Sequence, residues 1–230
     1  MIALTPIEIA EAVHGRLLPS PTGENEAPIA SQSQTDSREV SHGEIFVARR
    51  GAETDGHLFA SKAVDSGAAL LIVEREVDDR VPQVVVDDAT VALGFLAKAV
   101  VHRALSGGKL RIVGITGSNG KTTTKNLVAS MAQRLGPTVA SEKSFNNEVG
   151  GPLTMIRVAE DTETLVAEMG ASAEGEIARL TDMAPPYIGV VLSVGLAHAG
   201  EFGGIETTFR TKSEMVRDLP DTAVAVLNRD

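Results

Sequence analysis

The chain has 230 residues, a formal net charge of −10 and no cysteine. Hydrophobic residues make up 43% of it, which is enough for a packed core and for two domains of ordinary size, and which argues against intrinsic disorder. The negative charge argues against a nucleic-acid backbone as partner, and the lack of cysteine excludes a disulfide scaffold and thiolate chemistry.

The first hundred residues show the signals of a small α/β domain. Thr5 and Glu8 form a capping box with Pro6 at the first helical position, so a short helix should end near Gly15. The next elements are expected in this order: a loop over 19–34, a strand over 44–48, a helix over 57–66, strands over 69–73 and 83–86, and a helix from Asp88 to about Leu105. The Ser106-Gly107-Gly108 stretch reads as a linker. We therefore expect one domain over 1–106 and a second over 107–230.

The N-terminus has no basic segment of the kind that begins a signal peptide. The longest apolar runs, of about six residues, are far shorter than the ~20 residues of a membrane helix. The absence of cysteine fits the cytosol, where disulfides are rare. We therefore expect a cytoplasmic protein without membrane insertion.

The second half opens with a phosphate-binding pattern. An apolar strand over 110–115 runs into Gly117-Ser118-Asn119-Gly120-Lys121-Thr122-Thr123, and a helical pattern follows. Backbone N–H groups in such a turn point at phosphate oxygens, the lysine reaches the outer phosphates, and the threonine hydroxyl can bind magnesium. The spacing differs from the common P-loop, because Ile115 stands where its first glycine would be. A turn that only opens a helix is the alternative interpretation.

Leu127, Met131 and Leu135 recur every four residues after this turn and predict the buried face of a helix that Gly136 and Pro137 end. Further elements are expected as strands over 138–140, 164–167, 188–194 and 223–227, and as helices over 173–183 and 205–219. These elements predict an α/β fold, with a small N-terminal α/β domain followed by a doubly wound P-loop sheet. Because the last strand has no covering helix after it, we expect this second domain to be incomplete and the chain to be a fragment.

Two polar residues follow strands of this sheet. Glu168 comes directly after the strand over 164–167, where the carboxyl ends of parallel strands face the ligand. It is a candidate magnesium ligand, and a solvated surface carboxylate is the alternative. His198 follows the strand over 188–194, and its position alone leaves a ligand and a structural histidine equally open.

Lys212 lies in the middle of a helical stripe formed by Ile205, Phe209, Val216 and Leu219. The pattern by itself favours a lysine whose stem packs while its ammonium group reaches water. The alternative is a functional lysine, since burial favours the neutral amine and a neutral amine can react with carbon dioxide to form a carbamate.

Two further places in the chain have polar residues that could bind substrate. Asn146 and Asn147 follow the strand over 138–140, and they can either cap the next helix or bind substrate oxygens. Arg38, beside Ser37 and ahead of the strand over 44–48, could hold a pyrophosphate or simply lie at the surface.

Together these residues resemble the Mur ligases of peptidoglycan synthesis, and among them the MurF type. Seven segments carry the resemblance: TGSNGKT at 116–122, FNNEVGGPLT at 145–154, EMG at 168–170, GLAH at 195–198, TKSE at 211–214, DSR at 36–38 and DGH at 55–57. The loop departs from the family's TGTxGKT only at Ser118. The resemblance covers the whole chain.

The resemblance implies an ATP-dependent ligase that joins D-alanyl-D-alanine to UDP-N-acetylmuramoyl-tripeptide through an acyl phosphate. It implies that residues 1–106 bind the UDP-sugar, with Ser37 and Arg38 in contact with it, and that residues 107–230 bind ATP and Mg²⁺. The ATP residues would be Thr116, Gly117, Ser118, Asn119, Gly120, Lys121, Thr122 and Thr123. The magnesium ligands would be Thr122, Glu168, His198 and a carbamylated Lys212, with Lys121, Lys212 and His198 as catalytic residues and Asn146 and Asn147 on the substrate.

Family members carry a third domain that brings the amine substrate, so this chain would represent about the first half of a monomeric enzyme and would be inactive alone. Three other readings stay open. The chain could be a module that binds UDP-sugar or ATP without turnover, or a related Mur ligase that adds a different amino acid. It could also be a P-loop hydrolase, although we find no clear water-positioning glutamine or arginine finger.

Overall fold

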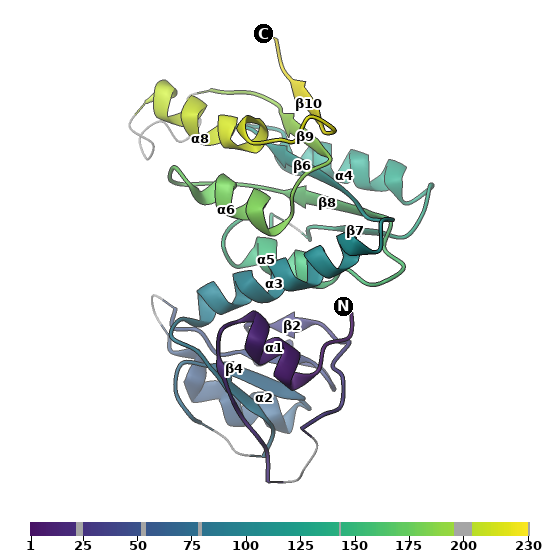
Figure 1. Cartoon of the computed structure of the whole chain (residues 1–230). Coiled ribbons are helices and arrows are strands. Elements are labelled where there is room, and N and C mark those ends of the chain that lie inside the picture. The colour runs from purple at the N-terminus through teal and green to yellow at the C-terminus, as the bar shows by residue number, and fades with distance from the viewer. Residues whose placement is uncertain (22–24, 52–53, 78–79, 143, 196–203, 230) are drawn as a thin grey trace. The chain divides into compact units, whose positions relative to one another are not determined.

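The computed structural model describes residues 1–21, 25–51, 54–77, 80–142, 144–195 and 204–229 (Figure 1). The chain forms two compact units, Met1–Val100 (unit 1) and Val101–Asp230 (unit 2). The division lies inside the helix α3 (Ala89–Ser106), whereas the sequence suggested a boundary after Ser106, where α3 ends. Asp88 caps α3 as expected, since its Oδ1 accepts hydrogen bonds from the N–H groups of Thr90 and Val91. What each unit binds stays a prediction.

Unit 1 holds a five-stranded sheet in the order β1-β5-β4-β3-β2, in which β1 is antiparallel to β5 and the other strands are parallel. Its elements are α1 (Pro6–Ala12), β1 (Arg16–Leu18), β2 (Ser33–Gln34), β3 (Ile45–Val47), the 3₁₀ turn η1 (Gly56–Phe59), α2 (Ala60–Asp65), β4 (Leu70–Val73) and β5 (Gln83–Val85). The sequence predicted these apart from β1 and β2. It assigned β2 to a loop, because edge strands of two or three residues are too short to show alternation.

Local signals in the sequence explain the packing of unit 1. The capping box at α1 is present, with the Thr5 N–H donating to Glu8 Oε2 at 2.8 Å and the Glu8 N–H to Thr5 Oγ1 at 3.3 Å. Ala60 and Ala63 of α2 pack in one cluster with Phe46, Leu71 and other buried apolar side chains. The small alanines let α2 lie close to this face of the sheet.

Unit 2 holds a parallel sheet in the order β10-β9-β6-β8-β7. Its elements are β6 (Arg111–Thr116), α4 (Lys121–Ala132), β7 (Thr138–Ala140), α5 (Gly150–Ile156), β8 (Thr164–Glu168), α6 (Glu176–Met183), β9 (Ile188–Val191), α8 (Ile205–Arg217) and β10 (Val224–Leu227). Each strand expected here is present. Because β6 lies between β8 and β9, the strand order reverses beside it, and ligands bind at such points in open α/β sheets.

Helices cover both faces of this sheet (Figure 1). On one face Ala129 of α4 packs in a cluster with Ile115 and Val166. On the other face Met215 of α8 approaches β6 at Gly114, where an added Cβ would lie 2.8 Å from the Met215 sulfur. The α/β doubly wound fold is therefore confirmed for the described part of unit 2.

The predicted buried face of α4 was wrong. Leu127, Met131 and Leu135 are 61%, 60% and 86% exposed, and α4 ends at Ala132. The buried residues are Lys125, Ala129 and Ala132, since the helix lies on the sheet through its small residues.

By length and composition alone, α3 passes as a membrane-spanning helix, and it alone does so among the described residues. Of its 18 residues, 44% are buried within the structure. The core helix of a soluble protein meets the same criteria, so this observation carries little weight.

Candidate functional site

The loop between β6 and α4 has the backbone geometry of a phosphate cradle. Gly120 is the N-cap of α4 and has a φ of +83°, a left-handed conformation that glycine adopts without strain. The N–H groups of the first turn of α4 have no partners within the helix and point out of its N-terminus. Thr123 lies in that turn with its side chain exposed, and Asn119 is exposed at the tip of the loop.

Lys121 folds back over this loop, where its Nζ donates to the carbonyl oxygen of Gly117 at 2.8 Å. Thr116, the last residue of β6, is fully buried, and its Oγ1 has no hydrogen-bond partner among the described residues. A ligand oxygen or a water at the cradle could satisfy that hydroxyl group. The loop therefore presents backbone donors and an ammonium group beside a buried hydroxyl group that lacks a partner among the described residues.

Glu168 lies next to the cradle at the carboxyl end of β8 and is only 2% exposed. Its Oε2 accepts a hydrogen bond from Thr122 Oγ1 at 2.9 Å, and its Oε1 accepts one from Asn146 Nδ2 at 2.8 Å. A solvated surface carboxylate, the alternative interpretation, is thereby excluded. The structure thus brings together three predicted site residues from three different segments.

The two adjacent asparagines have different contacts. Asn146 bonds Glu168, and its backbone oxygen accepts from the Gly170 N–H at 2.8 Å. A Cβ on Gly170 would lie 2.8 Å from Asn146 Cγ, so this close approach needs glycine. Asn147 Oδ1 accepts from the N–H groups of Val149 and Gly150 and so caps the start of α5. Contact of either asparagine with substrate stays a prediction.

Ser118 connects the cradle to the segment after β9. Its Oγ donates to the Gly195 carbonyl oxygen at 3.1 Å and accepts from the Gly195 N–H at 2.9 Å. The Ser118 N–H also donates to the Ser193 carbonyl oxygen at 2.9 Å. His198 comes three positions later in the chain but lies outside the described residues, so its predicted metal role stays a prediction.

Lys212 is 4% exposed on the inner face of α8. Burial lowers the pKa of its ammonium group, and the positive charge of Lys121 lowers it further. A surface lysine that snorkels to water does not fit this burial, and the neutral amine that carbamylation needs is favoured.

The predicted reason for that burial was wrong. Ile205 and Phe209 are 48% and 60% exposed, whereas Thr208, Thr211 and Met215 share the buried face with Lys212. The exposed side of α8 borders an apolar cavity of about 420 Å³, lined by Val194, Ile205, Glu206, Phe209 and Arg210.

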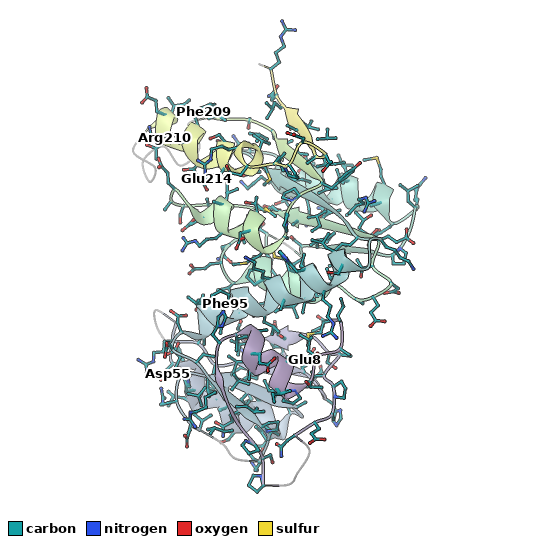
Figure 2. The ribbon with its side chains drawn as sticks, viewed as in Figure 1. Glu8, Asp55, Phe95, Phe209, Arg210 and Glu214 are labelled. Atoms are coloured by element: carbon teal, nitrogen blue, oxygen red, sulfur yellow. The ribbon has the colours of Figure 1, made fainter. Side chains whose placement is uncertain are left out.

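Two residues of α8 hold the helix against the start of α6. Glu214, 5% exposed, accepts hydrogen bonds from the N–H groups of Gly175 at 2.7 Å and Ala178 at 3.0 Å. Arg210 Nε donates to Glu174 Oε1 at 2.8 Å (Figure 2). Glu214 therefore caps α6 from another helix, and it links the segment after Glu168 to the helix that carries Lys212.

Magnesium prefers hard oxygen donors, and the donors around Glu168 fit this preference. A buried carboxylate and a threonine hydroxyl lie within 2.9 Å of each other beside the cradle. In the described ranges no group of three or more His, Asp or Glu side chains forms a ready metal site. A full ligand set would thus have to include ATP phosphates, water, or residues such as His198.

In unit 1, Ser37 and Arg38 follow β2. Arg38 is exposed and forks onto Asp36, with its Nε donating to Oδ1 at 2.9 Å and its Nη2 to Oδ2 at 2.6 Å. This bond to Arg38 lowers the pKa of Asp36 to about 2. Ser37 is buried. Binding of a pyrophosphate by Arg38 would replace its pairing with Asp36 and stays a prediction.

The turn before α2 has a structural role. The buried His57 bonds Asp55 through Nδ1 at 2.6 Å and accepts the Glu74 N–H through Nε2 at 2.8 Å, which requires the neutral imidazole with its proton on Nδ1. Arg75 bonds the other oxygen of Asp55 at 2.8 Å. A polar cavity of about 540 Å³ lies nearby, lined by His14, Gly15, Arg16, Glu74, Val85, Val86 and Asp87. Neither Ser37 nor Arg38 lines it.

Sequence reasoning missed three buried polar residues of unit 2: Lys125, Ser141 and Glu214. Each is a polar side chain on an inward face, and its partner lies in another segment. Lys125 lies four residues after Lys121 and so on the same side of α4, which could have marked Lys125 as inward. The apolar stripe of Leu127, Met131 and Leu135 suggested instead that another face of α4 is buried.

Comparison with known proteins identifies the family of this chain. Residues 115–230 match the Mur ligase middle domain, and residues 32–101 match the catalytic domain of the Mur ligase family. The UDP-N-acetylmuramoyl-tripeptide–D-alanyl-D-alanine ligase of Mycobacterium leprae is 42% identical over all of this chain and 48% of its own length.

Two solved structures are similar as well. MurF from Acinetobacter baumannii has a TM-score of 0.86 and 32% identity, with 99% of this chain and 49% of that one covered. The MurF ligase of Thermotoga maritima in complex with ADP has a TM-score of 0.77 and 34% identity, with 88% and 46% covered. The chain spans about half the length of the relatives it matches. With the middle-domain match extending over half of its residues, the chain belongs to the Mur ligase family.

Proposed function

We propose that this chain supplies the UDP-sugar-binding and ATP-binding parts of a ligase that adds D-alanyl-D-alanine to UDP-N-acetylmuramoyl-tripeptide. The observation that carries the proposal is the arrangement at Glu168, where a buried carboxylate bonds Thr122 of the phosphate loop and Asn146. Similar chains named as such ligases, from Mycobacterium leprae and other bacteria, support the choice of amine substrate.

ATP would lie with its phosphates on the loop from Thr116 to Thr123. The backbone N–H groups of the first turn of α4 would bind the phosphate oxygens, and Lys121 would leave the Gly117 carbonyl to contact the outer phosphates. The ADP complex of the Thermotoga maritima relative supports nucleotide binding at this fold.

Mg²⁺, when bound by Thr122 and Glu168, would neutralise charge on the phosphates as the γ-phosphoryl group moves. Asn146 orients the Glu168 carboxylate through Oε1, and Thr122 bonds Oε2, so Glu168 and Thr122 would together hold the metal. Lys212, carbamylated, and His198 would complete a second metal position near the substrate carboxylate.

The reaction that follows is acyl activation. An oxygen of the substrate carboxylate attacks the γ-phosphorus of ATP, and the bond between that phosphorus and the β–γ bridging oxygen breaks. The products of this step are an acyl phosphate and ADP. The amine of D-alanyl-D-alanine then attacks the acyl carbon, and phosphate leaves with formation of the amide. Catalysis comes mainly from positioning and charge neutralisation, to which Lys121 contributes directly.

For unit 1 we propose binding of the UDP part of the substrate, with Ser37 and Arg38 in contact with it. We further propose a monomer in the cytoplasm. Ligation is expected to require the polypeptide that the relatives carry beyond the half they share with this chain, so residues 1–230 alone should bind ligands without turnover.

The experiment for this chain is calorimetric titration with two ligands. UDP-N-acetylmuramoyl-tripeptide and Mg²⁺·ATP should each bind with one site per chain, and saturation with one should leave a site for the other. Lys121→Ala should lose only the nucleotide site, because Lys121 donates its hydrogen bond within the phosphate loop. Failure of the wild-type chain to bind the UDP-sugar while it binds ATP would favour a P-loop hydrolase.

A further inference from the structure

Lys125 is a buried cation that the proposed function does not use. It lies on α4 one turn after Lys121, is 3% exposed, and faces the sheet instead of the phosphate loop. Its Nζ donates to the carbonyl oxygen of Ser141 at 2.6 Å. A buried ammonium group costs free energy unless strong hydrogen bonds satisfy it, so this contact needs an explanation.

The contact changes the last hydrogen bond of the ladder between β7 and β8. The Ser141 N–H donates to the Val166 carbonyl oxygen, as a parallel ladder requires. The next bond of such a ladder would run from the Glu168 N–H to the Ser141 carbonyl oxygen. Instead, that oxygen accepts from Lys125, and the Glu168 N–H donates to Ser141 Oγ at 3.2 Å.

After Ser141 the strand β7 has ended, and a residue further along the chain contacts Glu168 again. Asn146, five residues after Ser141, donates to Glu168 Oε1 at 2.8 Å and accepts the Gly170 N–H at 2.8 Å. Backbone and side chain of Glu168 are therefore both held by the segment from Ser141 to Asn146. Lys125 fixes the first residue of that segment to α4, the same helix that carries Thr122.

We propose that Lys125 is a positioning residue for the Mg²⁺·nucleotide site, acting through Ser141 on Glu168 and Asn146. The inference rests on the proposed function, in which Glu168 binds magnesium. In this proposal the ammonium group of Lys125 does not contact the nucleotide, because it bonds the Ser141 carbonyl oxygen. By holding the Ser141 carbonyl oxygen it lets the Ser141 hydroxyl accept from Glu168, which keeps the carboxylate in register with Thr122.

The test measures ATP affinity of the 230-residue chain by calorimetry, once with Mg²⁺ and once with EDTA. Lys125→Met keeps the apolar stem and removes the donor. It should weaken Mg²⁺·ATP binding roughly tenfold, the scale of losses when residues that orient metal ligands are removed, and change metal-free ATP binding less than about twofold. Ser141→Ala keeps the carbonyl but removes the acceptor for Glu168, and should show the same selective loss.

Ala129→Gly is the matched control, because it lies on the same buried face of α4 and destabilises the helix by about 1 kcal/mol without removing the Lys125–Ser141 hydrogen bond. It should leave both affinities unchanged. Hydrogen exchange adds a readout independent of nucleotide, since the amides of Glu168 and Gly170 should exchange faster in Lys125→Met than in Ala129→Gly.

Equal weakening with and without Mg²⁺, or wild-type behaviour of Lys125→Met, would overturn the inference and leave the proposed function intact. If Lys125→Met does not fold, Ser141→Ala decides by the same two affinities. If Mg²⁺ does not strengthen ATP binding by the wild-type chain, the magnesium role of Glu168 fails, and this inference fails with it.

Discussion

Replacing Glu214 by alanine tests how α8, the helix of Lys212, is held in place. The Glu214 carboxylate is buried and accepts the N–H groups of Gly175 and Ala178 at the start of α6 (Figure 2). Hydrogen bonds to a charged group contribute about 1.5–3 kcal/mol each, and loss of an N-terminal cap costs about 0.5–2 kcal/mol. Because these terms overlap, we expect Glu214→Ala to destabilise unit 2 by about 2–4 kcal/mol.

The assay is differential scanning calorimetry of the chain. For a unit of this size, about 2–4 kcal/mol corresponds to a fall on the order of 10 °C in the transition of unit 2. Glu214→Gln keeps one acceptor oxygen and should lose about half as much. Glu206→Ala, an exposed glutamate on the same helix, is the control and should leave the transition within about 2 °C of wild type.

Equal melting of Glu214→Ala and Glu206→Ala would refute the idea that Glu214 anchors α8. Hydrogen exchange gives a second measure, because the amides of Gly175 and Ala178 should lose protection only in the Glu214 variants. Unchanged protection there would show that the two N–H groups find other partners.

Three further predictions concern the site itself. Asn146→Ala should weaken Mg²⁺·ATP binding more than Asn147→Ala does, since of the two asparagines Asn146 bonds Glu168. Asn147→Ala should instead cost about 1 kcal/mol of stability, because Asn147 caps α5. The reverse order of the two ATP affinities would contradict the assignment. Folding lowers the pKa of Lys212 below 10.5, so the unfolded chain binds more protons between the two pKa values and the charged lysine destabilises the fold at lower pH. In CO₂-free buffer, Lys212→Met should therefore stabilise the chain at pH 7, and the gain should vanish as the pH rises from the folded pKa of Lys212 to 10.5. A stability difference that does not change with pH would refute this. Incubation with ¹³C-labelled bicarbonate should give a carbamate NMR signal that Lys212→Met lacks, and an identical signal from the variant would place the carbamate elsewhere.

Local signals predicted much of the fold and the positions of the glycine-rich turn and of Glu168. The capping box of Thr5, the cap at Asp88 and the glycine-rich turn at Gly120 are each specified by a few adjacent residues, and all three are present. The position of Glu168 at a strand end followed from sheet topology. These predictions succeed because the cause lies within one segment or in the order of strands.

The helix faces were harder to predict, because periodicity reveals a stripe but not which side it faces. On α4 and α8 the large apolar residues Met131 and Phe209 are exposed, while Lys125 and Lys212 are buried. Both lysines interact with other segments: Lys125 donates a hydrogen bond to Ser141, and the charge of Lys121 lowers the pKa of Lys212. A rule that places hydrophobic residues inside fails where the inner face of a helix carries polar groups of a site.

The different roles of Asn146 and Asn147 could not be read from the sequence either. Two adjacent asparagines have the same tendency to cap a helix, and the structure distinguishes them because Asn146 bonds Glu168 whereas Asn147 accepts the Val149 N–H. The hydrogen bond that distinguishes Asn146 joins two residues 22 positions apart in the chain, so no local pattern predicts it.

Ligation by a chimera tests the central claim most directly. Residues 1–230 would replace the matching half of the Mycobacterium tuberculosis relative, which is 41% identical over all of this chain. Phosphate release should require UDP-N-acetylmuramoyl-tripeptide, D-alanyl-D-alanine and ATP together, with one ligated product per phosphate, and Lys121→Ala should abolish it while UDP-sugar binding persists. Phosphate release that needs neither the UDP-sugar nor the dipeptide would contradict the account and identify a hydrolase.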